Sequence, residues 1–377
     1  MQHGIPDRPP QPEGAVWLGY NPMQPAFWDL APHSVHTYVY RDVETALTAT
    51  RYWTSQIVSQ RPPEVSAALR DLPVTIFYRG QSEFTHRLLP TRHRGPRRQV
   101  PQRVRVPLTV SPRTTRGLSG LPQVAFIPDG LYAAPAEIIE EVRRVQGNWA
   151  ESDPTMRNVD DIVAALAPEV LKDFDLREKK AIQTATARFP AIAALDPFRR
   201  RATVRHYTGV PSALLDVSSD IEVAAFFATS GGVPPARNTL GMLWAIDLGM
   251  LVRYFHLGTS PVPGGYEVVL EDTRADWGDN ARFFKEQGIQ PLSVRLTSVE
   301  LPFPRPRAQK AFFLELRGRD SAPLSPRDEA IWWSLIERWA YPNGFVQTGL
   351  PYENRAAGVS SAALLPIDDP FVVLRTL

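Results

Sequence analysis

The sequence contains no cysteine and no long apolar run. The absence of cysteine excludes structural disulfides, thiolate nucleophiles and cysteine-ligated zinc. No apolar run reaches the length of a membrane span, so no membrane partner is expected. The first residues also lack the basic and apolar stretches that begin a secretory signal. These absences predict a cytoplasmic protein by default, with secretion as an effector left open.

Several widespread catalytic and nucleotide-binding motifs are missing as well. The sequence has no Gly-x-Gly-x-x-Gly, no phosphate-binding P-loop, no His-Glu-x-x-His and no Gly-x-Ser-x-Gly. His33 and His36 lie on a proline-flanked stretch without a further cluster of ligands, so no metal site is predicted. A metal-dependent enzyme acting on nucleic acid is disfavoured because no carboxylates stand out at metal-binding spacing.

The composition that remains is typical of a globular protein. Of 377 residues, 43% are hydrophobic and 22% are charged, which suits a chain with a sizeable core. The formal net charge of +2 argues against a molecule that binds nucleic acid through its overall charge. The basic residues are 37 arginines and five lysines, so a single arginine is weak evidence for a site.

The strongest local charge bias lies in residues 84–128. This segment has no acidic residue but nine arginines, and prolines interrupt it throughout. It is interpreted either as a solvated loop whose arginines pair with distant acids, or as a surface that faces a polyanionic or protein target. Aromatic residues are absent from its basic part, so it offers no platform for base stacking.

The hydrophobic pattern predicts an α+β fold, because strands predominate in the second half without regular alternation with helices. Strands are predicted at 74–78, 242–246, 266–270, 294–299 and 312–316, and helices at 45–59, 135–145, 158–188, 219–228 and from 325 through 339. The predicted organisation has three parts. Residues 1–70 form an N-terminal arm, irregular up to residue 35, with a helix packing on the core. Residues 71–320 form the main domain, with a helical insertion at about 131–200. Residues 321–377 form a C-terminal helical extension.

Three distant segments are candidates for a common site: one around Arg79, one from Arg205 to Ser219, and one from Arg307 to Phe313. Arg79 ends a strand-like run, offers a planar fork for phosphate or ribose, and is followed by Gly80, which permits close approach. His206 and Tyr207 stand beside a Gly-x-Pro turn and would clamp a flat ring or a sugar. Asp216 follows two leucines, so it is expected to be partly buried and paired with Arg79 or His206. The alternative for each is an ordinary ion pair or a core side chain.

The segment after Asp216 leads from a strand into a helix. Ser219 and Glu222 have the spacing of a capping box, which predicts Ser219 as the N-cap. A helix N-terminus also attracts anions, so Ser218 is a candidate for binding a ligand.

Together these segments resemble the FRG domain, a bacterial family named after a Phe-Arg-Gly motif. The likeness spans roughly residues 72–316. The matching segments are Tyr78-Arg79-Gly80; Leu88-Leu89-Pro90 with Arg92 or Arg94; His206-Tyr207 through Asp216; Ala224 to Ala228; and Arg305 to Phe313. The sequence departs from the family pattern at Thr208, Ser212, Ala213, Val217 and Ala311, which places the details of substrate geometry in question.

The order of FRG motifs is in turn similar to that of ADP-ribosyltransferases. This second likeness implies a split β-sheet core, NAD as substrate, and an enzyme that modifies a protein or nucleic-acid target or hydrolyses NAD, as a toxin or defence effector. It implies that Tyr78-Arg79-Gly80 forms the first motif, that Ser218 bonds a ribose hydroxyl, and that Gln309 or Glu315 acts in the third. His206, Tyr207 and Asp216 would hold NAD. The alternative is a non-catalytic module that binds a nucleotide or a partner.

Overall fold

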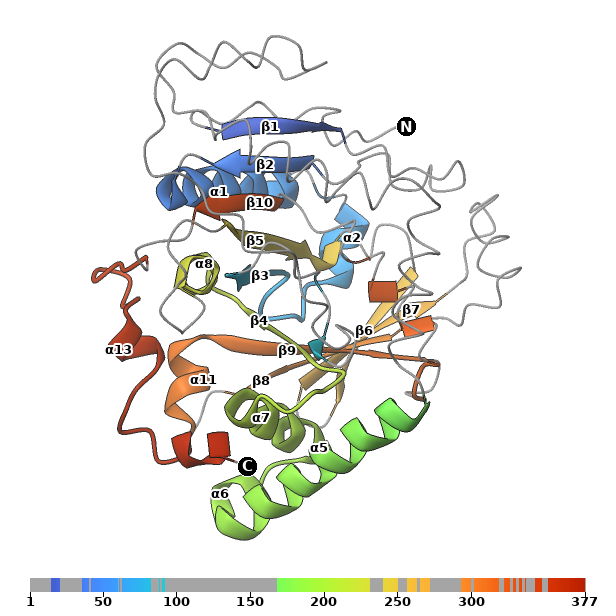
Figure 1. The fold of residues 1–377 in the computed structure, drawn as a ribbon. Helices are drawn as coiled ribbons and strands as arrows, with labels where there is room; N and C mark the ends of the chain where they lie inside the picture. The colour runs from blue at the N-terminus through green and yellow to red at the C-terminus, as the bar shows by residue number, and fades with distance from the viewer. Residues whose placement is uncertain are drawn as a thin grey trace.

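The structure is a computed structural model, shown in Figure 1. It describes residues 15–20, 36–40, 42–59, 61, 63–82, 88, 90–91, 168–230, 240–249, 256–262, 265–271, 293–299, 302–318, 322–325, 328–329, 332–333, 336, 343–347 and 352–376. The fold is α+β, as predicted, with helices against a largely antiparallel sheet.

The described strands form one sheet in the order β1-β2-β10-β5-β3-β4-β9-β8-β7-β6. In Figure 1 they follow one another downward from β1 to β9, and β7 and β6 lie to the right. Their bounds are β1 Ala15–Tyr20, β2 His36–Tyr40, β3 Ile76–Gln81, β4 Leu215–Ser218, β5 Leu240–Asp247, β6 His256–Val262, β7 Gly265–Glu271, β8 Ser293–Ser298, β9 Ala311–Arg317 and β10 Asn343–Gln347. The five predicted strands are therefore confirmed as β3, β5, β7, β8 and β9, while β1, β2, β4, β6 and β10 are additional.

Both ends of the chain supply strands to this sheet. β1 lies within the stretch predicted to be irregular, and that part of the prediction is wrong. β10 comes from the region predicted as a helical extension and pairs parallel to β2 and antiparallel to β5. The remaining described pairings are antiparallel. The N- and C-terminal segments are thus joined to the central strands by backbone hydrogen bonds.

The described helices begin where proline or a capping side chain permits. Their bounds are α1 Val43–Ser59, α2 Pro63–Ala68, α5 Pro168–Arg188, α6 Pro190–Ala193, α7 Pro197–Thr208, α8 Ile221–Ser230, α11 Pro304–Ala308, α13 Ser361–Leu364 and the 3-10 helix η5 Val372–Thr376. α7 shows the pattern well: Asp196 accepts hydrogen bonds from Phe198 N and Arg199 N, and Gly209 ends the helix at a φ of 67°. The helix predicted at 135–145 lies outside the described residues.

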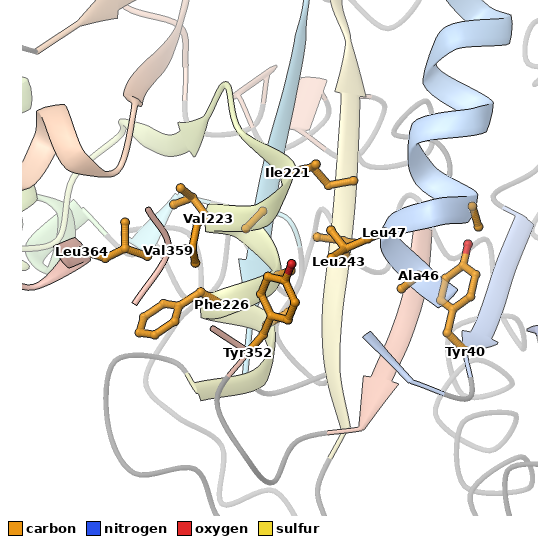
Figure 2. Close-up of a cluster of buried hydrophobic side chains, with 14 residues drawn as sticks. Tyr40, Ala46, Leu47, Ile221, Val223, Phe226, Leu243, Tyr352, Val359 and Leu364 are labelled. Atoms are coloured by element: carbon orange, nitrogen blue, oxygen red, sulfur yellow. The ribbon is translucent and has the colours of Figure 1, made fainter. Parts of the chain in front are cut away.

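α8 is packed directly on the sheet because glycine lets the backbones approach. A Cβ on Gly80 of β3 would lie 1.7 Å from Ala224 O, and one on Gly241 of β5 would lie 1.9 Å from Ala228 O. Figure 2 shows the apolar side chains around this helix, with Phe226 lying on the side of Val359 and Leu364. This core joins α8 to α1 and to the C-terminal segment.

A second core lies between α7 and β9. Phe313 and Ala311 of β9 pack with Tyr207 of α7 and with Phe303 and Phe371. Because Phe313 pairs with Asp216 in register, the face of β4 that carries Asp216 is the face covered by α7. The helix thus brings its last turn over the region where the candidate residues of β4 lie.

None of the described helices is long and apolar enough to cross a membrane.

Candidate functional site

The candidate site lies where strands β3 and β4 separate. These neighbours share a single paired position, Tyr78 with Ser218, whereas β3 pairs with β5 along its whole length. Side-chain alternation from that pair directs Arg79 and Asp216 to opposite faces. The Arg79 guanidinium nevertheless donates to both the carbonyl oxygen and the carboxylate of Asp216. Arg79 therefore occupies the opening between the strands, within β3 rather than at its end.

The side chain of Asp216 is more exposed to solvent than that of Arg79, at 37% against 11%. Burial raises the pKa of Asp216, but the charges of Arg79 and Arg205 and the hydrogen bond from Arg79 outweigh burial and hold this pKa well below its usual range. Asp216 is thus an anion at every physiological pH, held in place by arginine and still open to solvent.

Arg205 and His206 of α7 lie beside this ion pair, both buried. Burial, followed by the charge of Arg305, lowers the pKa of His206 to about 3, although Asp216 acts in the opposite direction. Burial likewise lowers the pKa of Arg205. His206 is therefore a neutral imidazole, and its ring meets Phe313 edge-on at 5.7 Å between centroids. It lies in the last turn of α7 itself, ahead of the Gly-x-Pro turn predicted to hold it.

Tyr207 points away from the ion pair and joins the second core. Its hydroxyl donates to Asp369 Oδ2 at 2.6 Å, and the same oxygen accepts from Arg305 N at 3.2 Å. Burial, then the bond to Asp369, raises the pKa of Tyr207 above its ordinary value, so the phenol stays protonated. Its observed contacts hold the C-terminal segment against α7 rather than a ring-shaped ligand.

Replacing Tyr207 with phenylalanine is expected to destabilise the protein by about 1–3 kcal/mol, because the buried Asp369 carboxylate loses its hydroxyl donor. Urea unfolding measures this loss. Tyr78→Phe is the matched control, since its hydroxyl makes only a 3.4 Å contact with Thr54, and should change stability by less than about 0.5 kcal/mol. Equal losses in the two variants would contradict an anchoring role for Tyr207.

Glu315 lies on the same face of β9 as Phe313 and is almost fully buried. It accepts hydrogen bonds from Arg201 and, at 3.0 Å, from Arg317. Arg201 also donates to Glu178 of α5 at 3.1 Å. Burial lowers the pKa of Arg201, but the combined effects of Glu315 and Glu178 are larger and opposite. The pKa of Arg201 therefore lies above its ordinary value. Glu315 is therefore one member of a closed ion-pair network beneath α5 and α7.

A second group of predicted residues is engaged in structural contacts. Ser218 Oγ donates to Gln309 O at 2.8 Å and accepts from Asp220 N at 3.0 Å. The Gln309 side chain donates to Leu364 O at 2.7 Å, which ties the end of α11 to the C-terminal segment. The cap of α8 is Asp220, whose carboxylate accepts from Glu222 N at 2.8 Å. The prediction of Ser219 as the side-chain cap is therefore corrected.

The structure thus separates the predicted residues into two sets. Arg79, His206 and Asp216 come together, and Glu315 lies on the adjoining ion-pair network. Tyr78 and Gly80 instead face α8, and Ser218 and Gln309 bond to backbone groups.

Sequence reasoning assigned no role to several charged residues of the site. They are Glu178, Arg201, Arg205, Arg305 and Asp369. Of these residues, Arg205 could most easily have been identified from the sequence, because it immediately precedes the candidate pair His206-Tyr207 in α7.

Comparison of the chain with protein-family models, curated proteins and solved structures finds no match.

Proposed function

We propose that this chain is an NAD-consuming enzyme of the ADP-ribosyltransferase type, built on a split-sheet core. The observation that carries the proposal is the meeting of Arg79, His206 and Asp216 at the opening between β3 and β4. Arg79 comes from a segment more than 100 residues before the one that carries His206 and Asp216, and the two segments were expected to meet for this chemistry. Their order along the chain, resembling FRG domains, is the second support.

The polar groups present fit a dinucleotide. Nε of Arg79 and Nε of Arg205 are buried and have no hydrogen-bond partner among the described residues. Buried N–H groups without partners are uncommon, and phosphate oxygens are suitable acceptors for arginine. NAD would supply these oxygens through its pyrophosphate.

The reaction breaks the bond between ribose C1′ and the nicotinamide nitrogen, and both bonding electrons leave with nicotinamide. Positive charge then develops on the ribose until an acceptor forms a new bond to C1′ and loses its proton. A fixed anion near the ribose lowers the energy of that state. Asp216 meets this need, because its pKa is depressed and its carboxylate is partly accessible.

Glu315 has a different part in this proposal. Its side chain is 3% exposed and bonded to Arg201 and Arg317, so it acts by positioning those arginines rather than by touching substrate. Gln309 is occupied with Leu364 O and is likewise a supporting residue. Of the two alternatives for the third motif, Glu315 lies on β9 two residues from Phe313, the register partner of Asp216.

The acceptor is a polyanionic or protein target, or water. The Arg-rich segment 84–128 lies almost wholly outside the described residues. Its described part supports a location beside the site, since Thr91 Oγ1 accepts a hydrogen bond from Ser212 N, four residues before Asp216.

Release of nicotinamide from NAD by the purified chain tests the proposal. Arg79→Lys is expected to reduce release at least about 100-fold, because lysine keeps the charge but loses the planar fork. Arg61→Lys is the matched control: Arg61 is also buried and ion-paired, but with Asp247 of β5. The two variants are expected to lose similar stability, and only Arg79→Lys to lose activity. Equal activity in the two would overturn the role of Arg79.

A non-catalytic nucleotide-binding module is the second candidate. The confinement of Glu315 by two arginines favours it, because a carboxylate so held is poorly placed to contact a substrate. Binding of NAD without release of nicotinamide under any condition that supports binding would decide for this function.

A further inference from the structure

Positive charge accumulates around His206 at the point where three parts of the chain meet. Arg205 belongs to α7, Arg305 to α11 and Arg375 to η5, and the charges of all three act on His206. Arg79 of β3 acts on Asp216 from the other side. Figure 1 shows α7, α11 and the C-terminal helical turn close together at one end of the molecule. Three arginines thus act on one neutral imidazole, and a fourth is paired with the neighbouring Asp216.

The described carboxylates do not balance these charges. Asp216 is taken up by Arg79. Asp369 accepts from a tyrosine hydroxyl and from two backbone N–H groups, so its one negative charge stands against the three positive charges of Arg205, Arg305 and Arg375. Glu178 is near Arg205 but is bonded to Arg201 and to a serine hydroxyl. A surplus of positive charge therefore remains on the side of the cluster that Arg305 and Arg375 occupy.

Several hydrogen-bonding nitrogens of this cluster also lack partners. Nε of Arg205, Nε of Arg305 and Nε2 of His206 are buried and make no hydrogen bond with any described residue. Arg205 is 8% exposed and His206 9% exposed. Burial, followed by the charge of Arg375, lowers the pKa of Arg305 to about 10, so these two cations repel each other. Uncompensated buried cations reduce stability unless an anion joins them.

We infer that Arg205, Arg305 and Arg375 form a subsite for the pyrophosphate of a dinucleotide, with Nε2 of His206 as an additional polar contact. The identity of the ligand rests on the proposed function, whereas the requirement for an oxygen-rich dianion follows from the arginines themselves. The C-terminal segment is part of this subsite: it contributes Arg375 directly, and it fixes α11 through Asp369. Arg375 is exposed and marks the side from which the phosphates enter.

Calorimetric titration of the full chain with ADP-ribose, adenosine and inorganic pyrophosphate tests the subsite. ADP-ribose is expected to bind about tenfold or more tightly than adenosine, and its affinity to fall as salt concentration rises. Arg305→Gln and Arg375→Gln are each expected to weaken ADP-ribose about tenfold and to leave adenosine unchanged. Neither variant should lower the melting temperature, because each removes one of two repelling cations.

Two neighbouring arginines provide matched controls. Arg307 lies on α11 and Arg355 in the C-terminal segment, and both are exposed. Arg307→Gln and Arg355→Gln make the same change in net charge and are expected to alter ADP-ribose affinity by less than about twofold. If they weaken binding as much as Arg305→Gln and Arg375→Gln, the effect is one of overall charge and the subsite is wrong. Pyrophosphate binding as tight as that of ADP-ribose would overturn the assignment to a dinucleotide.

Nicotinamide release separates this inference from the proposed function. If ADP-ribose binds with the expected losses but NAD is not cleaved, the subsite stands and the proposed reaction fails. If NAD is cleaved and Arg305→Gln leaves its KM unchanged, the reaction stands and the subsite is wrong.

Discussion

Replacing Gly80 with alanine is expected to prevent folding or to destabilise the protein by more than about 4 kcal/mol. The added Cβ would lie 1.7 Å from Ala224 O and 2.5 Å from Ala228 N, both backbone atoms of α8. Backbone atoms inside a helix cannot move aside without breaking its hydrogen bonds. The helix would have to shift away from β3, which would open the core that Figure 2 shows.

Gly209→Ala is the control for this change. Gly209 has a φ of 67°, but a Cβ there would meet nothing within 4 Å. Alanine at that position is expected to reduce stability by only about 1 kcal/mol, through backbone strain alone. Circular dichroism shows whether each variant folds, and urea unfolding measures how much stability each one loses. If Gly80→Ala folds with a loss no larger than that of Gly209→Ala, the close packing of α8 on β3 is incorrect.

This prediction bears on how the motif Tyr78-Arg79-Gly80 is interpreted. Gly80 was expected to permit the close approach of another backbone or of a ligand, and in the structure it is the backbone of α8 that approaches it. Tyr78 faces the same helix, and burial raises its pKa, with the bond to Thr54 opposing the shift. Only Arg79 turns into the opening beside Asp216. The motif therefore combines two residues that hold a helix with one that serves the site.

Much of the central sheet was predictable because its strands are continuously apolar. The runs at 242–246 and 312–316 are buried almost throughout, and short apolar runs between turn signals favour strands. β10 was not predictable in this way. Its position between β2 and β5 depends on pairing with residues some 300 positions earlier, which no local pattern encodes.

The site was predictable to the extent that its residues follow apolar strands. Asp216 was expected to be partly buried beside Arg79 or His206, and it is. α7 escaped detection because its buried positions carry polar groups: Arg205, His206 and Tyr207 are all buried near its end. A helix whose inner face is charged shows no apolar periodicity, and such a face is itself a reason to suspect a ligand site.

The neutral His206 is expected to make the protein less stable as pH falls below 7. Its pKa in the folded state is about 3, below the ordinary 6.5. Between these values the unfolded chain binds a proton at this histidine that the folded chain does not. The free energy of unfolding therefore decreases as pH decreases. The full difference amounts to roughly 5 kcal/mol and develops between pH 6.5 and 3. About 2 kcal/mol of it is expected between pH 7 and 5, before most carboxylates begin to titrate.

Urea unfolding at pH 7, 6 and 5 measures this dependence, and His206→Gln provides the comparison. Glutamine cannot be protonated, so the variant is expected to lose about 2 kcal/mol less over the same range, even if it is less stable at pH 7. Imidazole resonances of His206 that do not shift between pH 7 and 5 would confirm the neutral ring directly. A resonance that titrates near pH 6.5 would show that Arg205, Arg305 and Arg375 do not bear on this ring as described. The same result would weaken the pyrophosphate subsite, because the charges of these arginines add to burial in lowering the pKa of His206.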